Sequence, residues 1–251
     1  MKILALDTSG SNCSVCFMED GKIVSEFSLS AGVTHSQTLL PIVDTLNQFS
    51  NIDISEIDIF ACSTGPGSFT GLRIGIATIK GFALSLEKKV IGIPTLLGLA
   101  YNIPYFDGLL CSVLDAKNNN VYAGIYQYQE GVPILVGDYI IESSEQLIEI
   151  LQEKLSSLPS QSSKVMFVGS GAITYEEKFT KAFGEKAYFA PLSLDRELAS
   201  SVALAAFHRA NHEDFDDYDT LVPMYLKKSQ AERMLEGENT EAKKDKKDDG
   251  C

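Results

Sequence analysis

An internal repeat constrains the fold of this chain more than any other feature of its sequence. Residues 5–17 (ALDTSGSNCSVCF) and 113–125 (VLDAKNNNVYAGI) share one plan, which is a strand, an aspartate, four turn residues, an asparagine and a strand. Residues 164–172 (KVMFVGSGA) likewise repeat the strand and glycine loop of residues 58–67 (DIFACSTGPG). Such a repeat in the same order predicts a duplicated unit. We therefore expect an α/β fold with two duplicated lobes that face each other across a cleft.

The order of apolar patterns assigns segments to the two lobes. Strands are predicted at 3–7, 13–18, 57–62 and 90–95, and helices at 34–49, 69–86 and 195–211. We assign residues 1–102 to an N-terminal lobe, completed by the returning segment 195–228, and residues 103–194 to a C-terminal lobe. The tail 237–251 (GENTEAKKDKKDDGC) is charged and nearly free of apolar residues, so we expect it to be disordered.

Net charge and the N-terminal sequence narrow the classes of function. The 251 residues carry a formal net charge of −13, which argues against broad electrostatic binding to nucleic acid or to an anionic membrane. The first apolar run is too short for a signal peptide and is interrupted by Asp7. No apolar run approaches the ~20 residues of a membrane span. We therefore expect a cytoplasmic protein with no membrane association.

Two pairs of residues resemble metal sites by their spacing alone. Cys13 and Cys16 form a CxxC, but they fall in a predicted strand, where residues three apart point to opposite faces. His208 and His212 share one face of a helix, and no third ligand accompanies them in the sequence. We expect no metal site.

The glycine-rich stretch STGPGSFTGLRIG at 63–75 links a predicted strand to a predicted helix. It lacks the Gly-Lys-Ser/Thr of a P-loop, and its glycines are spaced one residue too far apart for the dinucleotide-binding fingerprint. Backbone N–H groups at a helix N-terminus nevertheless favour an anion. Gly65 and Gly67 are therefore candidates for a phosphate loop, and the alternative is that they only permit tight turning.

The predicted hairpin tip at Asp7, Thr8 and Ser9 is the companion of the glycine loop. A tip with an aspartate and two hydroxyls can hold a phosphate. The alternative is that Asp7 caps the turn and the hydroxyls satisfy backbone groups. A kinase-like site needs a further acid or base in the cleft, and the sequence identifies none.

The helix predicted at 69–86 has two apolar faces. Leu72, Ile76 and Ile79 begin the stripe that we assign to the core. The opposite face carries further apolar and small residues, namely Ile74, Ala77, Gly81 and Leu84. This second face predicts either complete burial in the monomer or a protein–protein interface in which a second helix approaches closely.

The helix predicted at 34–49 adds to the candidate interface. Thr34 and Gln37 have the spacing of a capping box. His35 is assigned a role in the helix cap or the interface, and Leu39 and Ile42 are assigned to the partner surface. Arg73, outside this helix, is expected to organise the glycine loop or to pair with an acid across the cleft.

These motifs together resemble the bacterial TsaB (YeaZ) family over about residues 1–228. The sequence GPGSFTGLRIG is highly specific in this context, whereas DTS alone is a weak signal. The matching stretches are LALDTS at 4–9, THSQTLLP at 34–41, STGPGSFTGLRIG at 63–75, IPTL at 93–96, DAKNNNVYAGIY at 115–126 and VPMYLKK at 222–228.

The resemblance implies the fold shared by actin-like ATPases, sugar kinases and Hsp70 (ASKHA), related to that of TsaD. It also implies a part in tRNA modification, the formation of N6-threonylcarbamoyladenosine (t6A) in tRNAs that read codons starting with A. There TsaD transfers a threonylcarbamoyl group from threonylcarbamoyl-AMP to the adenine amine. TsaB is the obligate partner of TsaD in bacteria, and the TsaE ATPase joins them. The resemblance further implies a homodimer when TsaD is absent and only indirect contact with tRNA.

The resemblance also implies that this chain is not itself the catalyst. The TsaD-type relatives carry a metal-binding His-x-x-x-His just after the strand that follows the glycine-loop helix. Here that stretch is PTLLGLA, with Thr95 and Leu99 at the two histidine positions, and neither holds a metal as imidazole does. We expect a non-catalytic activator of TsaD without a cofactor of its own, apart from weak ATP or ADP binding at the complex interface. The alternative is an independent nucleotide-binding ATPase or phosphotransferase of the same fold.

Overall fold

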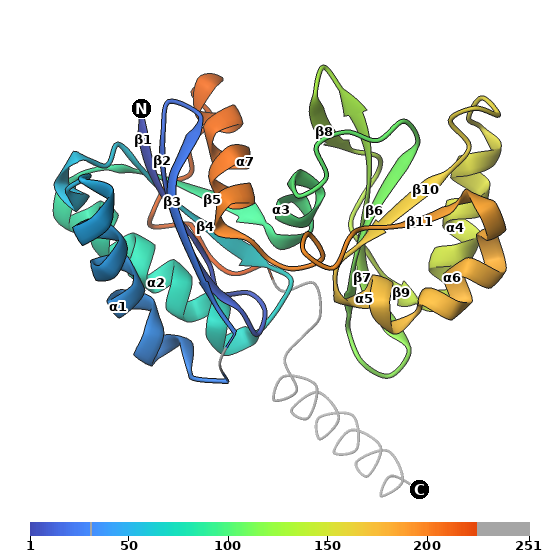
Figure 1. Ribbon diagram of the computed structural model, residues 1–251, viewed down its shortest axis with the longest axis horizontal. Coiled ribbons are helices and arrows are strands. Elements are labelled where there is room, and N and C mark those ends of the chain that lie inside the picture. Colours follow the sequence, from blue (N-terminus) through green and yellow to red (C-terminus); the bar gives the residue numbers. More distant parts are fainter. Residues whose placement is uncertain (31, 225–251) are drawn as a thin grey trace, which may run out of the picture.

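The computed structural model describes residues 1–30 and 32–224, which form two sheets with helices packed on them (Figure 1). The predicted disorder of residues 237–251 lies outside these described residues. The strands are β1 (Lys2–Asp7), β2 (Cys13–Glu19), β3 (Lys22–Leu29), β4 (Ile59–Gly65), β5 (Lys89–Pro94), β6 (Leu109–Asp115), β7 (Asn120–Gln129), β8 (Val132–Leu135), β9 (Ile140–Ser143), β10 (Val165–Val168) and β11 (Ala187–Phe189). The helices are α1 (His35–Ser50), α2 (Phe69–Leu86), α3 (Thr95–Tyr101), α4 (Ser144–Ser156), α5 (Ser170–Thr174), α6 (Glu176–Phe183) and α7 (Ala199–Asn211), with short 3-10 turns at Ile54–Glu56 and Gly184–Lys186.

The two sheets have the same strand order, which confirms the duplication predicted from the sequence. The N-terminal sheet runs β3-β2-β1-β4-β5, and the C-terminal sheet runs β8-β7-β6-β10-β11, with β9 also paired to β7. In each, the first strand pairs antiparallel with the second and parallel with the strand that precedes the glycine loop. We call each sheet with its helices a lobe, named N-terminal or C-terminal.

Both faces of the N-terminal sheet are covered, so its central strands are apolar on both sides. One core cluster joins β1, β2 and β4 to α1 and α2, and another joins the opposite faces of the same strands to α7. Cys13 lies in the first cluster and Cys16 in the second, which confirms that the CxxC thiols point to opposite faces. Burial raises the pKa of both thiols.

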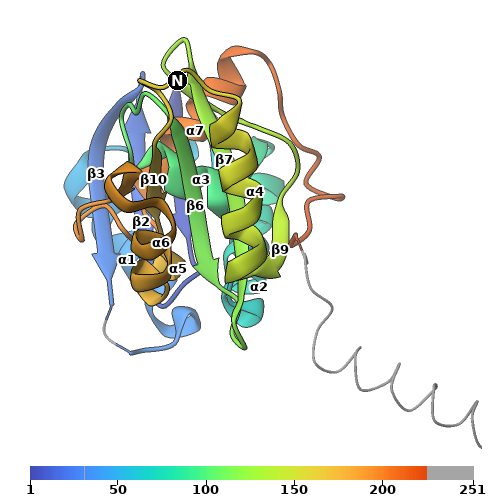
Figure 2. The same cartoon turned by 90° about the vertical axis from the view of Figure 1, so that its right-hand side faces the viewer.

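The C-terminal sheet carries its own helices. Helix α4 runs along the face of β7 and β9, and α5 and α6 pack near β6 and β11 (Figure 2). Their core is rich in stacked aromatic rings, and the ring centroids of Phe167 and Phe179 lie 4.3 Å apart. The short helix α3 contacts strands of both sheets and α7, so it forms the junction between the two lobes.

Three local expectations need correction. Thr34 is the N-cap of α1, but its side chain makes no capping hydrogen bond, so there is no capping box with Gln37. Phe49, at the end of the apolar repeat of α1, is 79% exposed. The final helix begins at Ala199 rather than at 195, because residues 195 and 196 form a bend and Leu198 has an extended backbone.

Helix α2 bears on the membrane expectation. By length and composition alone it could cross a membrane, although the sequence predicts no membrane span. Its buried residues, among them Leu72, Ile76 and Ile79, belong to the core or pack on β4. One such helix is weak evidence for a membrane protein, because helices that cover a sheet share these properties.

Candidate functional site

The tip of the β1–β2 hairpin is buried and bonded to itself. Asp7, Thr8 and Ser9 are each at most 3% exposed. The Asp7 carboxylate accepts hydrogen bonds from the Ser9 backbone N–H at 2.8 Å and from the Ser9 hydroxyl at 2.7 Å. Burial raises the pKa of Asp7, and the hydrogen bonds from Ser9 act in the opposite direction. The arrangement is the turn cap that we gave as the alternative to phosphate binding.

The glycine loop packs directly against this tip. The Ser68 N–H donates to the Ser9 carbonyl at 2.6 Å, and the Thr8 hydroxyl donates to the Gly71 carbonyl at 2.8 Å. A methyl group on Gly67 would come within 2.3 Å of the Ser9 carbonyl oxygen, which no real contact permits. Gly67 is therefore required for close approach of two backbones.

The start of α2 is capped from within the loop. The Ser68 hydroxyl accepts from the Gly71 N–H at 3.2 Å. Gly65 has a φ of 113°, which favours glycine, and its peptide bond to Pro66 is cis. The structure thus brings Asp7, Thr8, Ser9, Gly65 and Gly67 together, with groups of the tip and the loop bonded to each other. This geometry favours a shaping role for the glycines, and phosphate binding at these residues stays a prediction.

The sequence did not identify the acid that lies beside the tip, which is Glu197. A methyl group on Gly10 would come within 2.5 Å of Glu197 Oε2, so the carboxyl group packs on the turn that follows Ser9. Burial, and then the charge of Asp7, raises the pKa of Glu197 to about 7. A kinase-like site needs a further acid or base beside the hairpin tip, and Glu197 is an acid in that place. The sequence signal for Glu197 was the acidic stretch DREL at 195–198, which the predicted helix at 195–211 includes.

His35 and Arg73 each contact a part of this region. His35 Nε2 lies 3.0 Å from the Gly10 carbonyl oxygen, so the first residue of α1 touches the hairpin turn. The Arg73 guanidinium lies 3.8 Å from the centroid of the Phe69 ring, against the first residue of α2. Arg73 therefore packs on the first residue of α2, and its role in organising the loop or pairing with an acid stays a prediction.

The candidate partner surface divides into a buried part and an exposed part. Leu39 is 1% and Ile42 is 5% exposed, and both lie in the core cluster. Their assignment to the partner surface is wrong, because their face of α1 is already covered by the sheet. Ile74 is half-buried against the same core. The remaining three residues, Ala77, Gly81 and Leu84, are exposed on α2.

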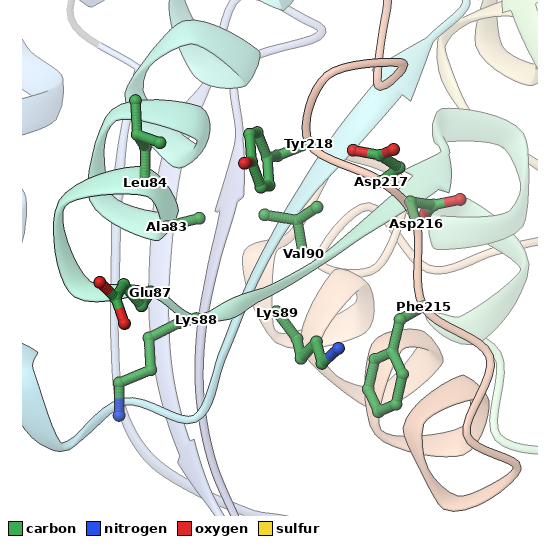
Figure 3. A pocket seen from close by; sticks show the side chains of 10 residues that line it. All are labelled: Ala83, Leu84, Glu87, Lys88, Lys89, Val90, Phe215, Asp216, Asp217 and Tyr218. Atoms are coloured by element: carbon green, nitrogen blue, oxygen red, sulfur yellow. The ribbon is translucent and has the colours of Figure 1, made fainter.

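A pocket of about 510 Å³ lies at the C-terminal end of this exposed stripe (Figure 3). Ala83, Leu84 and Val90 line it from α2 and β5, and Phe215 and Tyr218 from the segment after α7. Lys89 Nζ lies 5.6 Å from the Phe215 ring centroid. Charged residues complete the lining, so the exposed side of α2 is continuous with a hollow of mixed apolar and charged character.

Thr95 and Leu99 lie in α3 and are 2% and 1% exposed. The His208 ring lies 5.8 Å from that of Tyr101, and His212 is exposed at the C-cap of α7. Within residues 1–30 and 32–224, no three His, Cys, Asp or Glu side chains are grouped as a metal site.

Comparison with known proteins identifies the family. The model of the family described as TsaD, tRNA N6-adenosine threonylcarbamoyltransferase, matches residues 29–235. The tRNA threonylcarbamoyladenosine biosynthesis protein TsaB of Escherichia coli is 34% identical over 175 residues, covering 68% of this chain and 72% of that protein. The chain belongs to the TsaB (YeaZ) family. TsaB of Bacillus subtilis is 28% identical over 233 residues, covering 92% of this chain and 96% of that protein.

Solved structures agree with this family and with its fold. YeaZ from Pseudomonas aeruginosa superposes with a TM-score of 0.74 at 26% identity, covering 90% of this chain and 99% of that one. A ROK hexokinase from Thermus thermophilus reaches a TM-score of 0.50 at 10% identity, covering 84% of this chain and 100% of that one, which bears on the fold alone. The ASKHA fold that the TsaB resemblance implied is therefore confirmed, and the family takes part in t6A biosynthesis.

Proposed function

We propose that this chain is the non-catalytic partner and activator of the TsaD transferase in forming t6A in tRNAs that read codons starting with A. One observation carries the proposal: the chain matches the transferase family, yet Thr95 and Leu99 stand where the resemblance places the metal-binding histidines. Both side chains are buried in α3. The Leu99 side chain offers no lone pair to a metal ion, and the single hydroxyl of Thr95 does not hold a metal as imidazole does. In this proposal TsaD supplies the catalytic centre.

The proposed docking surface for TsaD is the exposed stripe of α2, formed by Ala77, Gly81 and Leu84. A methyl group on Gly81 would meet nothing within 4 Å in the monomer, so a partner helix can approach there closely. The same stripe serves a homodimer when TsaD is absent.

The rest of the proposed assembly follows from the charge of the chain. A net charge of −13 suits a subunit that contacts tRNA only through its partners, TsaD and the TsaE ATPase. The protein works in the cytoplasm. It holds no cofactor of its own, and ATP or ADP binds weakly, at the interface of the complex.

Reconstituted t6A synthesis tests the proposal. Purified TsaD, TsaE and the synthase that makes threonylcarbamoyl-AMP are combined with tRNA and ATP, with and without this chain. We expect t6A to form at a substantial rate only when the chain is present. Equal rates without it would contradict the activator role. Rapid ATP hydrolysis by the purified chain alone would instead support an independent ATPase.

Leu84→Glu tests the docking surface. Leu84 is 63% exposed, so the substitution should leave the monomer folded while burying a charge in the complex. We expect affinity for TsaD, measured by calorimetry, to fall about 30-fold or more, as for a residue central to an interface. Ile173→Glu, at a 54% exposed position on α5, is the matched control and should bind normally. Ile74→Glu is unsuitable, because Ile74 also packs against the core. Normal binding by Leu84→Glu would place the interface elsewhere.

A further inference from the structure

Within the part of the chain that the structure describes, two segments pass from one lobe to the other (Figure 1). The first crossing leaves β5, forms α3 and reaches β6. The second crossing, residues 190–198, leaves β11 and reaches α7. Lobes joined by two crossings can close like a hinge only if the crossings move relative to each other. The contacts between the crossings therefore decide whether the two lobes can change their mutual angle.

Asn102, at the C-cap of α3, bonds the two crossings to each other. Its side-chain Nδ2 group donates to the Leu194 carbonyl at 2.6 Å and to the Arg196 carbonyl at 2.7 Å. Its Oδ1 atom accepts from the Ser201 hydroxyl of α7 at 2.6 Å. Asn102 is 6% exposed, and both polar atoms of its side chain have partners. One buried side chain thus joins α3, the second crossing and α7.

Helix α3 is packed on by both lobes. Leu97 packs against the core cluster that contains α7. Leu99 belongs to another cluster, with residues of β6, β7 and β10. The Tyr128 hydroxyl of β7 contacts the carbonyl oxygens of Ala100 and Ile103 at the end of α3. Neither lobe can therefore rotate about α3 without exposing buried apolar surface.

The second crossing is held to each lobe as well. In the N-terminal lobe, the Asn12 side-chain amide donates to the Glu197 carbonyl at 2.8 Å. In the C-terminal lobe, the Gly169 N–H donates to the Asp195 carboxylate. Asparagine amides do not titrate, so the bonds from Asn12 and Asn102 do not depend on ionisation. The second crossing is therefore fixed to both lobes and to the first crossing.

We propose that Asn102 is the lock of this junction: by bonding the two crossings to each other, it makes the two lobes one rigid body with a fixed angle between them. Hinge closure would break the three hydrogen bonds of Asn102 and leave their buried donors and acceptors without partners. The chain therefore meets a partner or a ligand without closure of its lobes. This inference concerns the conformation of the chain and does not depend on the proposed role in t6A formation.

Double electron–electron resonance (DEER) between one spin label in each lobe measures this rigidity. Lys22→Cys on β3 and Glu149→Cys on α4 place the labels at exposed sites. The four cysteines of the described chain are buried, and Cys251→Ser removes the remaining one. Dilution with unlabelled chain suppresses distances between copies. The reference is a pair of labels within the C-terminal lobe, at Glu149 and the exposed Lys181 of α6.

For the chain with Asn102 intact, we expect a single distance between the lobes whose distribution is as narrow as that of the reference pair. Rigid packing within a lobe sets the width of the reference, so equal widths mean that the lobes do not move apart. A broad or two-peaked distribution between the lobes would overturn the proposal, and this outcome needs no change at Asn102.

Asn102→Leu then tests the lock itself, because leucine has a similar size and makes none of the three hydrogen bonds. We expect the distribution between the lobes to become about twofold broader or more, with the reference pair unchanged. Asn211→Ala, at the exposed end of α7, is the matched control and should stay narrow. An unchanged width in folded Asn102→Leu would overturn the proposal.

Ser201→Ala is the milder variant, for the case that Asn102→Leu does not fold. It breaks only the bond between Asn102 and α7. Its distribution between the lobes should also broaden, by less than that of Asn102→Leu. An unchanged width in Ser201→Ala, with Asn102→Leu unfolded, would assign Asn102 to stability alone and overturn the lock.

Discussion

The repeated hairpins place an aspartate at the same position in each lobe, yet the two aspartates differ in their surroundings. Asp7 is 2% exposed, and its carboxylate accepts hydrogen bonds from the backbone N–H and the hydroxyl of Ser9. Asp115 has a partly exposed side chain that pairs with Lys117 Nζ at 2.8 Å and accepts from the Tyr175 hydroxyl at 3.3 Å. The pKa of Asp7 is raised by burial. For Asp115, burial acts in the same direction, but the bonds from Lys117 outweigh it and lower the pKa.

This difference shows how a duplicated unit diverges when only one copy is covered by other segments. The glycine loop and the segment just before α7 cover the hairpin of the N-terminal lobe, so its acid lies among backbone groups and near another acid, Glu197. The hairpin of the C-terminal lobe stays near solvent and stabilises its acid with a lysine. The same motif thus gives a tightly packed junction in one lobe and a surface ion pair in the other.

The largest expected difference between the lobes concerns their glycines. In Gly67→Ala the new methyl group would lie 2.3 Å from the Ser9 carbonyl oxygen, and a backbone group between two packed elements cannot move away. In Gly171→Ala the nearest atom, at 2.5 Å, is Cγ1 of the Val113 side chain, and the nearest backbone atoms lie farther away, at 3.1 Å. We expect losses in the free energy of unfolding of about 3 kcal/mol and about 1 kcal/mol, respectively. Urea unfolding measures both.

Gly81→Ala is the control for these glycines, because nothing lies near its methyl group and Gly81 is inside α2. It should stabilise the monomer by about 0.5–1 kcal/mol through helix propensity. Equal losses for Gly67→Ala and Gly171→Ala would show that the two loops are packed alike.

The two aspartates should give opposite pH dependence of stability. Because the pKa of Asp7 is raised in the folded state, ionisation of Asp7 lowers the free energy of unfolding as the pH rises above 3.8. Near neutral pH, Asp7→Asn should therefore have a free energy of unfolding about 1 kcal/mol higher than that of the wild type. Because the folded pKa of Asp115 is lowered, its contribution is present above pH 3.8 and is lost as the pH falls. The free energy of unfolding of Asp115→Asn should therefore be about 0.5 kcal/mol lower than that of the wild type near neutral pH and almost unchanged near pH 2. Urea unfolding over this pH range would refute the comparison if both differences had the same sign.

The smallest effect is expected for the lysine that distinguishes the two hairpins. Lys117 is 82% exposed, so Lys117→Ala should lower the free energy of unfolding only slightly, and by less still in high salt. Alanine has to adopt the same positive φ of 62°, so the change isolates the ion pair. A loss in thermal unfolding as large as that of Gly67→Ala would show that the second hairpin is also tightly packed.

The sequence predicted the parts of the fold that depend on local pattern. The repeat gave the two sheets, and the apolar period of residues 69–86 gave α2 with its correct bounds. Periodicity could not tell which apolar side chains of α1 the sheet covers, so Leu39 and Ile42 were placed on the surface. The position of Glu197 beside the hairpin tip could not be predicted, because its neighbours Gly10 and Asn12 lie more than 180 residues away in the chain.

The first backbone N–H groups of α7 donate hydrogen bonds to side chains near the start of the chain. The side chain of its N-cap residue, Leu198, offers none; instead the Ser14 hydroxyl accepts from the Ala199 N–H at 3.0 Å, and the Glu26 carboxylate accepts from the Ser200 N–H at 2.9 Å. During synthesis on the ribosome, the face of the first sheet that α7 covers therefore stays bare until about residue 211 has emerged. The N-terminal lobe is translated first, but it is completed only when α7 has been made. The nascent chain therefore exposes an aggregation-prone apolar surface for most of its translation.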